Sequence, residues 1–476
     1  VTAAERVVVV GGGVAGLGAA LAYGRAGHQV TLIERDDLPA TADVEAAFAS
    51  ERRGAPQAHQ THGFLARIVV LLRERFPDVL DALRAAGCST MPGTANLGDP
   101  QPGDDDLAVL ITRRTTFEWV LRQAAAAEPT VTMRTGVGVA GLLVAVAAEA
   151  GSVGSTVPLV TGVRLDDGTS VTGDLVVAAT GRRGPLTSWL SDAGVEVPET
   201  IRESGLMYLS RWYRLPAGFD IGVDPKLGGD LGFVKYLAVP GDGGTLSVTL
   251  AVRSDDADLR AALMDPDRFE QACRALPGPD RFFREGPLEP YGSVRPMAGL
   301  LNRIRRFVDD GGQPRVLGFH AIGDAHTCTN PLYGRGCSLA LVQAVLLADA
   351  TAAHPHDAVA RALAYEAGSA REVEPWYEVS VQMDKLGADP AGFAGLGSPD
   401  GKGAKAIGAL FAAAATDPVI GRAMARFWNL LATPADLMAD GELLTRVAAV
   451  MADPDAHPVP PQVGPSRAEL LDALAA

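Results

Sequence analysis

The stretch RVVVVGGGVAGLGAALAYGRAGHQVTLIE, residues 6–34, carries the most specific structural pattern of the chain. It opens with a β-branched run over 6–10 that suits a strand buried on both faces, and a second such run spans 29–33. Between them, Gly11, Gly13 and Gly16 have the GxGxxG spacing. The first permits a tight turn, the second lets the backbone approach a pyrophosphate, and the third lets helix and strand pack closely. We therefore predict a strand, helix and strand that bind a dinucleotide.

Glu34 ends the second predicted strand and indicates how the adenosine would be held. Its carboxylate can accept hydrogen bonds from ribose hydroxyls, and its charge would repel a 2′-phosphate. The helix begins at Val14 and Ala15, where free N–H groups and a partial positive charge favour phosphates, and Arg35 follows Glu34. This unit alone leaves open whether the dinucleotide carries nicotinamide or flavin.

The composition limits the classes of function. At 476 residues the chain is too long for one simple core, and 47% hydrophobic with 21% charged residues is typical of a soluble globular protein. A net charge of −15 argues against nucleic acid. The four cysteines form no CxxC pair, so we expect reduced thiols in a cytoplasmic protein and no metal site. The apolar run 7–23 is too rich in glycine for a membrane span, so we expect no membrane insertion.

Later segments favour flavin over nicotinamide. A strand beginning near Val137 and a hairpin with an Asp-Gly turn over 162–168 precede DLVVAATG, residues 174–181, which we expect to return beside the first strand and end at Gly181. The strand in VLGFHAIGDA, residues 316–325, ends in Gly323 and Asp324, whose carboxylate could accept a hydrogen bond from a ribityl hydroxyl. This layout is typical of flavoproteins with two dinucleotide-binding segments.

The loop NPLYGRGCS, residues 330–338, follows at once and opens an apolar helix over 339–350. Pro331, Gly334, Gly336 and Cys337 lie where backbone N–H groups could face an isoalloxazine ring. A helix N-terminus there would stabilise negative charge near the flavin N1 and C2 carbonyl.

Together, in this order, these segments resemble the FAD-dependent monooxygenases of the p-hydroxybenzoate hydroxylase fold, and most of all the bacterial epoxidases and hydroxylases of polyketides and related natural products, including antibiotics. The resemblance covers most of residues 5–375. Arg114 enters through the pattern R-x-x-F-E-x-x-L over 114–121, although it could be a plain helix-start residue. The resemblance implies an FAD site lined by Gly11, Gly13, Val14, Ala15, Gly16, Glu34, Arg35, Gln57, Arg114, Val137, Gly181, Gly323, Asp324, Pro331, Gly334, Gly336 and Cys337.

The loop RGAPQAHQTH, residues 53–62, is similar to a Gly-x-Pro-Gln and His-x-His stretch of the polyketide epoxidases. His62 matches the second histidine, while Gln60 occupies the place of the first. With only His59 and His62 and no carboxylate pair nearby, a metal site has little support. We expect the loop to pack over the flavin, with His62 either structural or on the substrate side.

The resemblance predicts an α/β fold, α+β overall, with a discontinuous Rossmann-like FAD domain over 1–200 and 295–375. Residues 200–295 should form an antiparallel-sheet substrate domain, because 204–214 and 232–253 alternate. Its aromatic residues Tyr208, Trp212 and Tyr236 either face a small lipophilic substrate or form a plain sheet core. We expect 376–476 to be a helical cap, with a dimer interface as the alternative, so the oligomeric state stays open.

The implied function is transfer of an oxygen atom from O2, through a flavin C4a-hydroperoxide, to the substrate by epoxidation or hydroxylation. No acid or base residue stands out in the sequence. Thr180-Gly181 replaces the Asp-Gly usual in single-component hydroxylases. We therefore expect NAD(P)H to be the ultimate reductant, acting through a separate flavin reductase.

Three alternatives remain open. A flavin halogenase should carry Trp-x-Trp-x-Ile-Pro, which is absent from the sequence. A reductase of the geranylgeranyl-reductase type would hydrogenate double bonds instead of oxygenating them. A non-enzymatic escort protein would keep the Rossmann unit without flavin, which the later glycine-rich segments disfavour.

Overall fold

The computed structural model describes residues 4–38, 41–94, 97–145, 157–219, 227–284, 288–388, 402–458 and 463–475. Its central layer is a five-stranded parallel sheet in the order β18-β9-β1-β2-β5. These strands are β18 (Phe319–Ala321), β9 (Leu175–Ala178), β1 (Arg6–Val10), β2 (Gln29–Glu34) and β5 (Val131–Thr135). The pairing of Val7 with Leu175 confirms that the segment 174–181 returns beside the first strand.

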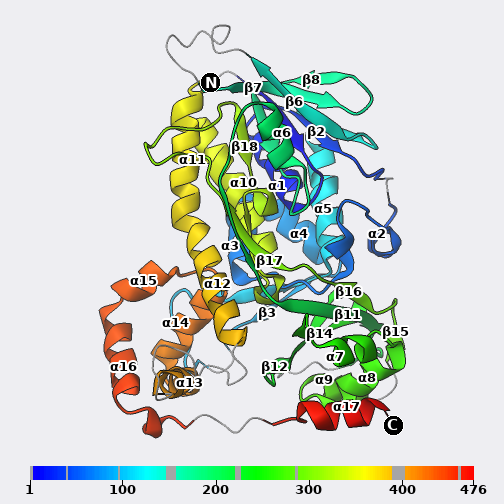
Figure 1. The fold of residues 1–476 in the computed structure, drawn as a ribbon, viewed down its shortest axis with the longest axis vertical. Helices are drawn as coiled ribbons and strands as arrows, with labels where there is room; N and C mark the ends of the chain where they lie inside the picture. The colour runs from blue at the N-terminus through cyan, green and yellow to red at the C-terminus, as the bar shows by residue number, and fades with distance from the viewer. Residues whose placement is uncertain are drawn as a thin grey trace.

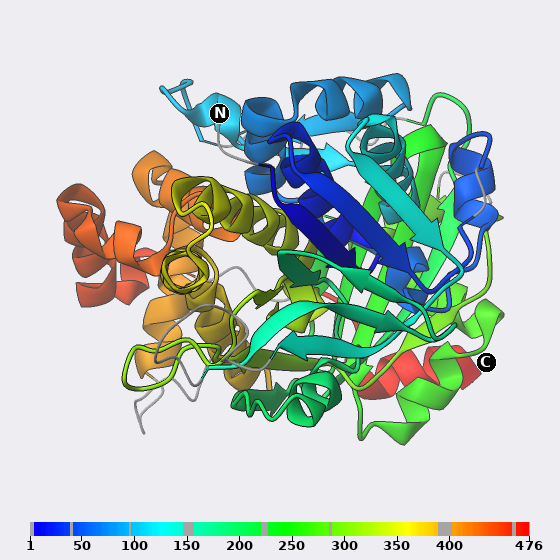
Figure 2. The ribbon, with the colours of Figure 1, turned by 90° about the horizontal axis from the view of Figure 1, so that it is seen from above.

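Two layers cover the parallel sheet (Figures 1 and 2). The helices α1 (Val14–Arg25), α5 (Arg114–Ala127) and α10 (Gly336–Ala353) bury one face in a shared core. An antiparallel sheet of β6 (Val139–Ala145), β7 (Leu159–Leu165) and β8 (Ser170–Thr172) packs on the other face. The strands of the parallel sheet are thus buried on both sides, as their unbroken β-branched runs require.

Glycine is required at two positions of the β1–α1 connection. Gly11 has φ +111°, which L side chains rarely adopt, and a Cβ at Gly16 would lie 1.8 Å from the carbonyl oxygen of Gly11. The close approach of α1 to the strand therefore depends on these two glycines.

The helix α10 is long and apolar enough to cross a membrane by length and composition alone. In the described structure most of this helix is buried, and Leu341, Ala344 and Leu347 lie in the core beside α1. Burial in that core accounts for its apolar composition.

A second, mostly antiparallel sheet contains β12 (Gly228–Asp230), β13 (Val234–Gly241), β14 (Thr245–Arg253), β11 (Leu206–Arg214), β15 (Glu289–Pro290) and β16 (Arg295–Met297). One face packs on α7 (Ala257–Leu263), α8 (Pro266–Ala275) and α9 (Pro279–Arg284), which the alternation alone had not indicated. Along β11, Leu209 and Tyr213 face these helices, while Tyr208 and Ser210 face a cavity toward the parallel sheet.

Shorter elements complete this part of the fold. A three-stranded sheet of β10 (Glu199–Glu203), β17 (Leu301–Arg305) and β19 (Thr327–Cys328) connects the two larger sheets along the chain. The others are α2 (Val44–Ala49), α3 (Ala66–Arg75), α4 (Pro77–Ala85), β3 (Ser89–Pro92), β4 (Ala108–Ile111) and α6 (Leu186–Asp192).

The C-terminal helices lie in different places (Figure 1). The helices α11 (Ala358–Glu372) and α12 (Glu374–Ala388) pack against the core that contains α10. A separate small core joins α13 (Lys402–Ala414), α14 (Pro418–Trp428), α15 (Pro434–Ala439) and α16 (Gly441–Ala452). The last helix, α17 (Arg467–Ala475), instead packs beside α8. Its Arg467 pairs with Asp256 at 2.8 Å, so the segment 376–476 does not form a single cap.

Candidate functional site

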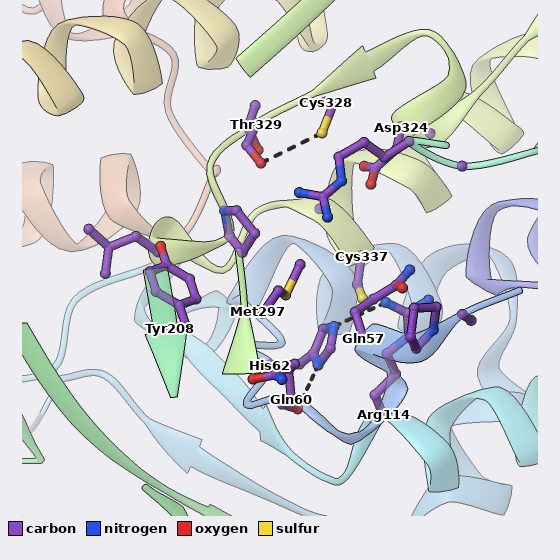
Figure 3. A pocket seen from close by; sticks show the side chains of 18 of the residues that line it. Gln57, Gln60, His62, Arg114, Tyr208, Met297, Asp324, Cys328, Thr329 and Cys337 are labelled. Atoms are coloured by element: carbon purple, nitrogen blue, oxygen red, sulfur yellow. Dashed lines mark hydrogen bonds between the residues drawn. The ribbon is translucent and has the colours of Figure 1, made fainter. Parts of the chain in front are cut away.

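A cavity of about 1450 Å³ runs from the β1–α1 connection to the antiparallel sheet. Pockets for one small ligand usually measure about 300–1,000 Å³, so this cavity has room for a cofactor and a substrate together. Its walls come from segments far apart in the sequence, and Figure 3 shows Tyr208 on the opposite side of the view from Arg114 and Gln57.

The nucleotide end of the cavity contains the first predicted residues. Gly11, Gly13, Val14, Ala15, Glu34 and Arg35 all border it. Gly16 lies behind them, in the contact between α1 and β1. The amide of Gly12 donates to the Glu34 Oε2 at 2.6 Å, which holds that carboxylate beside the N-terminus of α1.

A buried charge cluster supports this end of the cavity. The Arg52 guanidinium donates to Glu34 at 3.0 Å and to Glu118 at 2.6 Å. Burial raises the pKa of Glu118, but Arg114 and Arg52 outweigh burial and hold that pKa at about 2. The sequence did not indicate this cluster, because Arg52 lies 18 residues from Glu34 and 66 residues from Glu118 along the chain.

Arg114 and His62 meet on the wall of the cavity (Figure 3). Arg114 donates to Glu118 at 2.8 Å and to the His62 Nε2 at 3.0 Å. Because Nε2 accepts from Arg114, the Nδ1 of His62 carries the proton and donates to the Gln60 carbonyl at 2.9 Å. Burial and Arg114 lower the pKa of His62 to about 3, so this ring is neutral at physiological pH.

Two further predicted segments form the wall facing Arg114. Gly323 and Asp324 lie in a short 3₁₀ turn after β18, and burial raises the pKa of Asp324 despite nearby arginines. The loop with Pro331, Gly334, Gly336 and Cys337 also borders the cavity, where α10 begins at Gly336. This helix end therefore points a partial positive charge at the cavity.

Other predicted residues border the same cavity from separate segments. Gln57, Val137 and Gly181 belong to three different parts of the chain. Arg182 and Arg183 follow Gly181 on this wall, and neither was predicted as a site residue. No group of three or more His, Cys, Asp or Glu side chains suited to a metal occurs among the described residues.

The three aromatic residues predicted on the substrate side differ in position. Tyr208 borders the cavity and donates to the Asn330 Oδ1 at 2.5 Å. Tyr236 borders it as well, although it also belongs to the core against the helices. Trp212 is absent from the described cavity wall: its indole N–H donates to the His59 carbonyl at 2.8 Å and its ring packs on Phe48.

One family model matches the N-terminal unit. Residues 6–53 match the model described as pyridine nucleotide-disulphide oxidoreductase. No curated protein matches the sequence significantly. This match covers only the nucleotide-binding segment already identified from the glycine spacing.

Solved structures extend the likeness over most of the chain. PqsL, a probable FAD-dependent monooxygenase from Pseudomonas aeruginosa, is 17% identical with a TM-score of 0.59, covering 83% of this chain and 99% of that one. A flavin-dependent brominase is 17% identical with a TM-score of 0.63, covering 95% and 100%. OxyS anhydrotetracycline hydroxylase from Streptomyces rimosus is 19% identical with a TM-score of 0.56, covering 91% and 77%. The chain therefore has the fold of the flavin-dependent monooxygenases.

Proposed function

We propose that this protein is an FAD-dependent monooxygenase acting on a small lipophilic molecule. The observation that carries the proposal is a single cavity in which a dinucleotide-binding end continues into a pocket on the antiparallel sheet. An oxygenase needs both parts joined, because oxygen is transferred between a bound cofactor and a substrate beside it.

The residues present fit FAD. The helices α1 and α10 both begin at the cavity wall, so their N-termini suit a diphosphate at one point and a negatively charged ring at the other. Glu34 would hold the ribose and Asp324 a ribityl hydroxyl, while Arg114 would lie beside the cofactor. Bound FAD would supply the two electrons and the activation of O2.

The protein's own contribution is orientation and exclusion of water. Ala251, Leu237 and Met297 give the substrate end apolar walls. His62 is neutral and hydrogen-bonded on both ring nitrogens, so it holds the loop 53–62 in place and is not available as a general base. We propose that the substrate is a lipophilic natural product.

A separate flavin reductase is part of the proposal. The loop at Thr180 and Gly181 has no aspartate for a nicotinamide-linked contact. The second GxGxxG spacing of the chain, at Gly136, Gly138 and Gly141, runs into the strand β6 and not into a helix, so it lacks the helix N-terminus that would hold a pyrophosphate. Anaerobic mixing of the purified protein with NADPH should leave the flavin absorbance unchanged until a reductase is added. Rapid bleaching without a reductase would show that this part is wrong. The four cysteines are all buried and free, which suits a cytoplasmic enzyme.

The proposed function is tested first by the spectrum and then by the product. The purified protein should be yellow and release FAD on heating. After reduction with dithionite, isotopically labelled O2 should place one labelled atom in an aromatic or polyene product. A hydrogenated product without label would favour a reductase, and a protein that binds no FAD would contradict the proposal.

A matched pair of variants tests the cofactor site. Asp324→Ala should weaken FAD binding about tenfold or more, since it removes an acceptor buried in the cavity wall. Asp349→Ala, which removes an exposed carboxylate paired with Arg75, should leave FAD affinity unchanged. Equal FAD affinities in the two variants would remove Asp324 from the site.

A further inference from the structure

A polar cluster lies on the cavity wall at the substrate end. We define the Asp384 cluster as Asp384, Tyr333, Asn330, Asn302 and Tyr208. Asp384 comes from α12, and its Oδ1 accepts from the Tyr333 hydroxyl at 2.7 Å and from the Asn330 Nδ2 at 2.8 Å. Its Oδ2 accepts from the Asn302 Nδ2 at 2.6 Å. Asp384, Tyr333 and Tyr208 border the cavity, so the cluster faces the space proposed for substrate.

Backbone donors set the orientation of both amides in this cluster. The amide N–H of Leu332 donates to the Asn330 Oδ1 at 3.1 Å, and the N–H of Asn330 donates to the Asn302 Oδ1 at 2.8 Å. Because a backbone N–H can only donate, the Nδ2 of each asparagine must point to Asp384. The carboxylate is therefore surrounded by donors and serves as an acceptor.

Asp384 makes no salt bridge among the described residues. Burial raises the pKa of Asp384, although the three neutral donors and the positive charge of Lys235 oppose that effect. The Arg335 guanidinium is fully buried, and its Cζ lies 4.9 Å from the centroid of the Tyr333 ring. The hydroxyl of the same tyrosine donates to Asp384. The Asp384 carboxylate is therefore more basic than an exposed aspartate.

The Asp384 cluster leaves one acceptor position open. An ionised carboxylate offers about four lone-pair sites, and the protein donors occupy three of them. The surrounding cavity wall is apolar at Leu332, Met297 and Met383. A substrate that fits this end should be apolar and carry a hydrogen-bond donor. Lys235 borders the same end, which disfavours a cationic donor such as an ammonium group.

We propose that Asp384 binds the hydroxyl group of a phenolic substrate and accepts its proton during oxygenation. This inference rests on the proposed function and narrows it from epoxidation to hydroxylation of a phenol. The substrate O–H bond breaks, an O–H bond forms on Asp384, and the electron pair left on the phenol oxygen makes the ring more nucleophilic. The O–O bond breaks, one oxygen atom forms a C–O bond with the ring, and the other leaves as water with two electrons from the reduced flavin and two protons from the flavin and solvent. The hydrogen displaced from that ring carbon moves to the new oxygen as the ring regains aromaticity. The proton held by Asp384 then returns to the original phenol oxygen.

Binding of three matched probes tests this inference without turnover. 2-Naphthol can donate a hydrogen bond, whereas naphthalene and 2-methoxynaphthalene cannot. The holoenzyme should bind 2-naphthol about tenfold or more tightly than either reference, because the hydrogen bond is to a charged group. Asp384→Asn keeps the shape but removes the charge, and its preference should fall below about threefold. Glu378→Gln, an exposed acid on the same helix, should keep the wild-type preference.

A pH series decides the matter even if Asp384→Asn does not fold. The wild-type preference for 2-naphthol should fall as pH drops through the pKa of Asp384, because the protonated carboxyl no longer accepts at that position. A preference that is absent, independent of pH, or unchanged in Asp384→Asn would overturn the inference. If the protein holds no FAD yet shows this preference, the proposed function fails and the hydroxyl site stands. If labelled oxygen is transferred but 2-naphthol is not preferred, the proposed function stands and the hydroxyl site fails.

Discussion

The substitution Arg52→Met tests whether the buried charge cluster supports the nucleotide end of the cavity. The Arg52 side chain is 7% exposed, and its partners Glu34 and Glu118 are 6% and 3% exposed. Methionine fills much of the same space but carries no charge. The variant therefore leaves three buried carboxylates, those of Glu34, Glu118 and Asp36, without their shared cation.

The expected loss follows from the burial of this cluster. Removing one partner of a buried ion pair costs about 3–5 kcal/mol of unfolding free energy, because an uncompensated charge stays behind. Arg114 still pairs with Glu118 at 2.8 Å, so we expect the lower end, about 3 kcal/mol. Arg75→Met is the control: Arg75 and Asp349 are 42% and 52% exposed, and such a pair contributes less than about 1 kcal/mol.

Urea unfolding followed by tryptophan fluorescence measures the midpoint and slope of unfolding for the wild type and each variant.

The unfolding free energy should depend on pH with a definite sign. In the wild type the pKa of Glu118 is lowered to about 2, so its contribution is present above the unfolded pKa of about 4.3 and is lost as pH falls toward 2. In Arg52→Met that pKa rises, so the deficit relative to wild type should shrink as pH falls.

Two results would refute this reasoning. The first is a loss no larger than that of Arg75→Met, which would mean that the cluster contributes little. The second is a deficit that is the same at every pH, which would mean that the loss comes from packing and not from charge. FAD affinity should fall in Arg52→Met as well, because Arg52 holds the Glu34 carboxylate proposed to bind the ribose.

Three further predictions use other features. Gly16→Ala should cost at least about 1–3 kcal/mol and abolish FAD binding, since its Cβ would meet the Gly11 carbonyl; a stable yellow variant would contradict this. Iodoacetamide at neutral pH should label none of the four buried cysteines before unfolding, because burial raises the pKa of Cys337, for example, to about 11; mass spectrometry checks this. Burial raises the pKa of Glu45, but hydrogen bonds from Tyr291, Arg214 and Arg113 outweigh burial and lower that pKa to about 2. Stability should therefore fall as pH drops from about 4 toward 2, and Glu45→Gln should lose part of that dependence in acid titrations.

The parts of the site that depend on local sequence could be predicted. Gly11, Gly13 and Gly16 act through a turn and a helix contact within six residues, so their spacing carries the information. The same holds for Gly323-Asp324 and for the loop before α10, where a strand end or a helix start follows from the adjacent residues. These segments border the cavity, and their contact with FAD stays a prediction.

Alternation along a strand was less informative. Tyr208 and Trp212 lie on the same face of β11, four residues apart, yet only Tyr208 reaches the described cavity wall. The loop carrying His59 and the helix α2 with Phe48 cover Trp212. A period of two assigns a side chain to a face of a sheet, but not to what packs on that face.

The glycine spacing predicts the dinucleotide-binding unit and the later glycine-rich segments, because each motif closes within a few residues. Which charges meet depends on the packing of segments that are distant in the sequence. Arg52 reaches Glu118 across 66 residues and Asn302 reaches Asp384 across 82. No local spacing records such a contact, since it depends on how whole layers pack. The acceptor site at Asp384 forms where α12 packs against the loop that precedes α10.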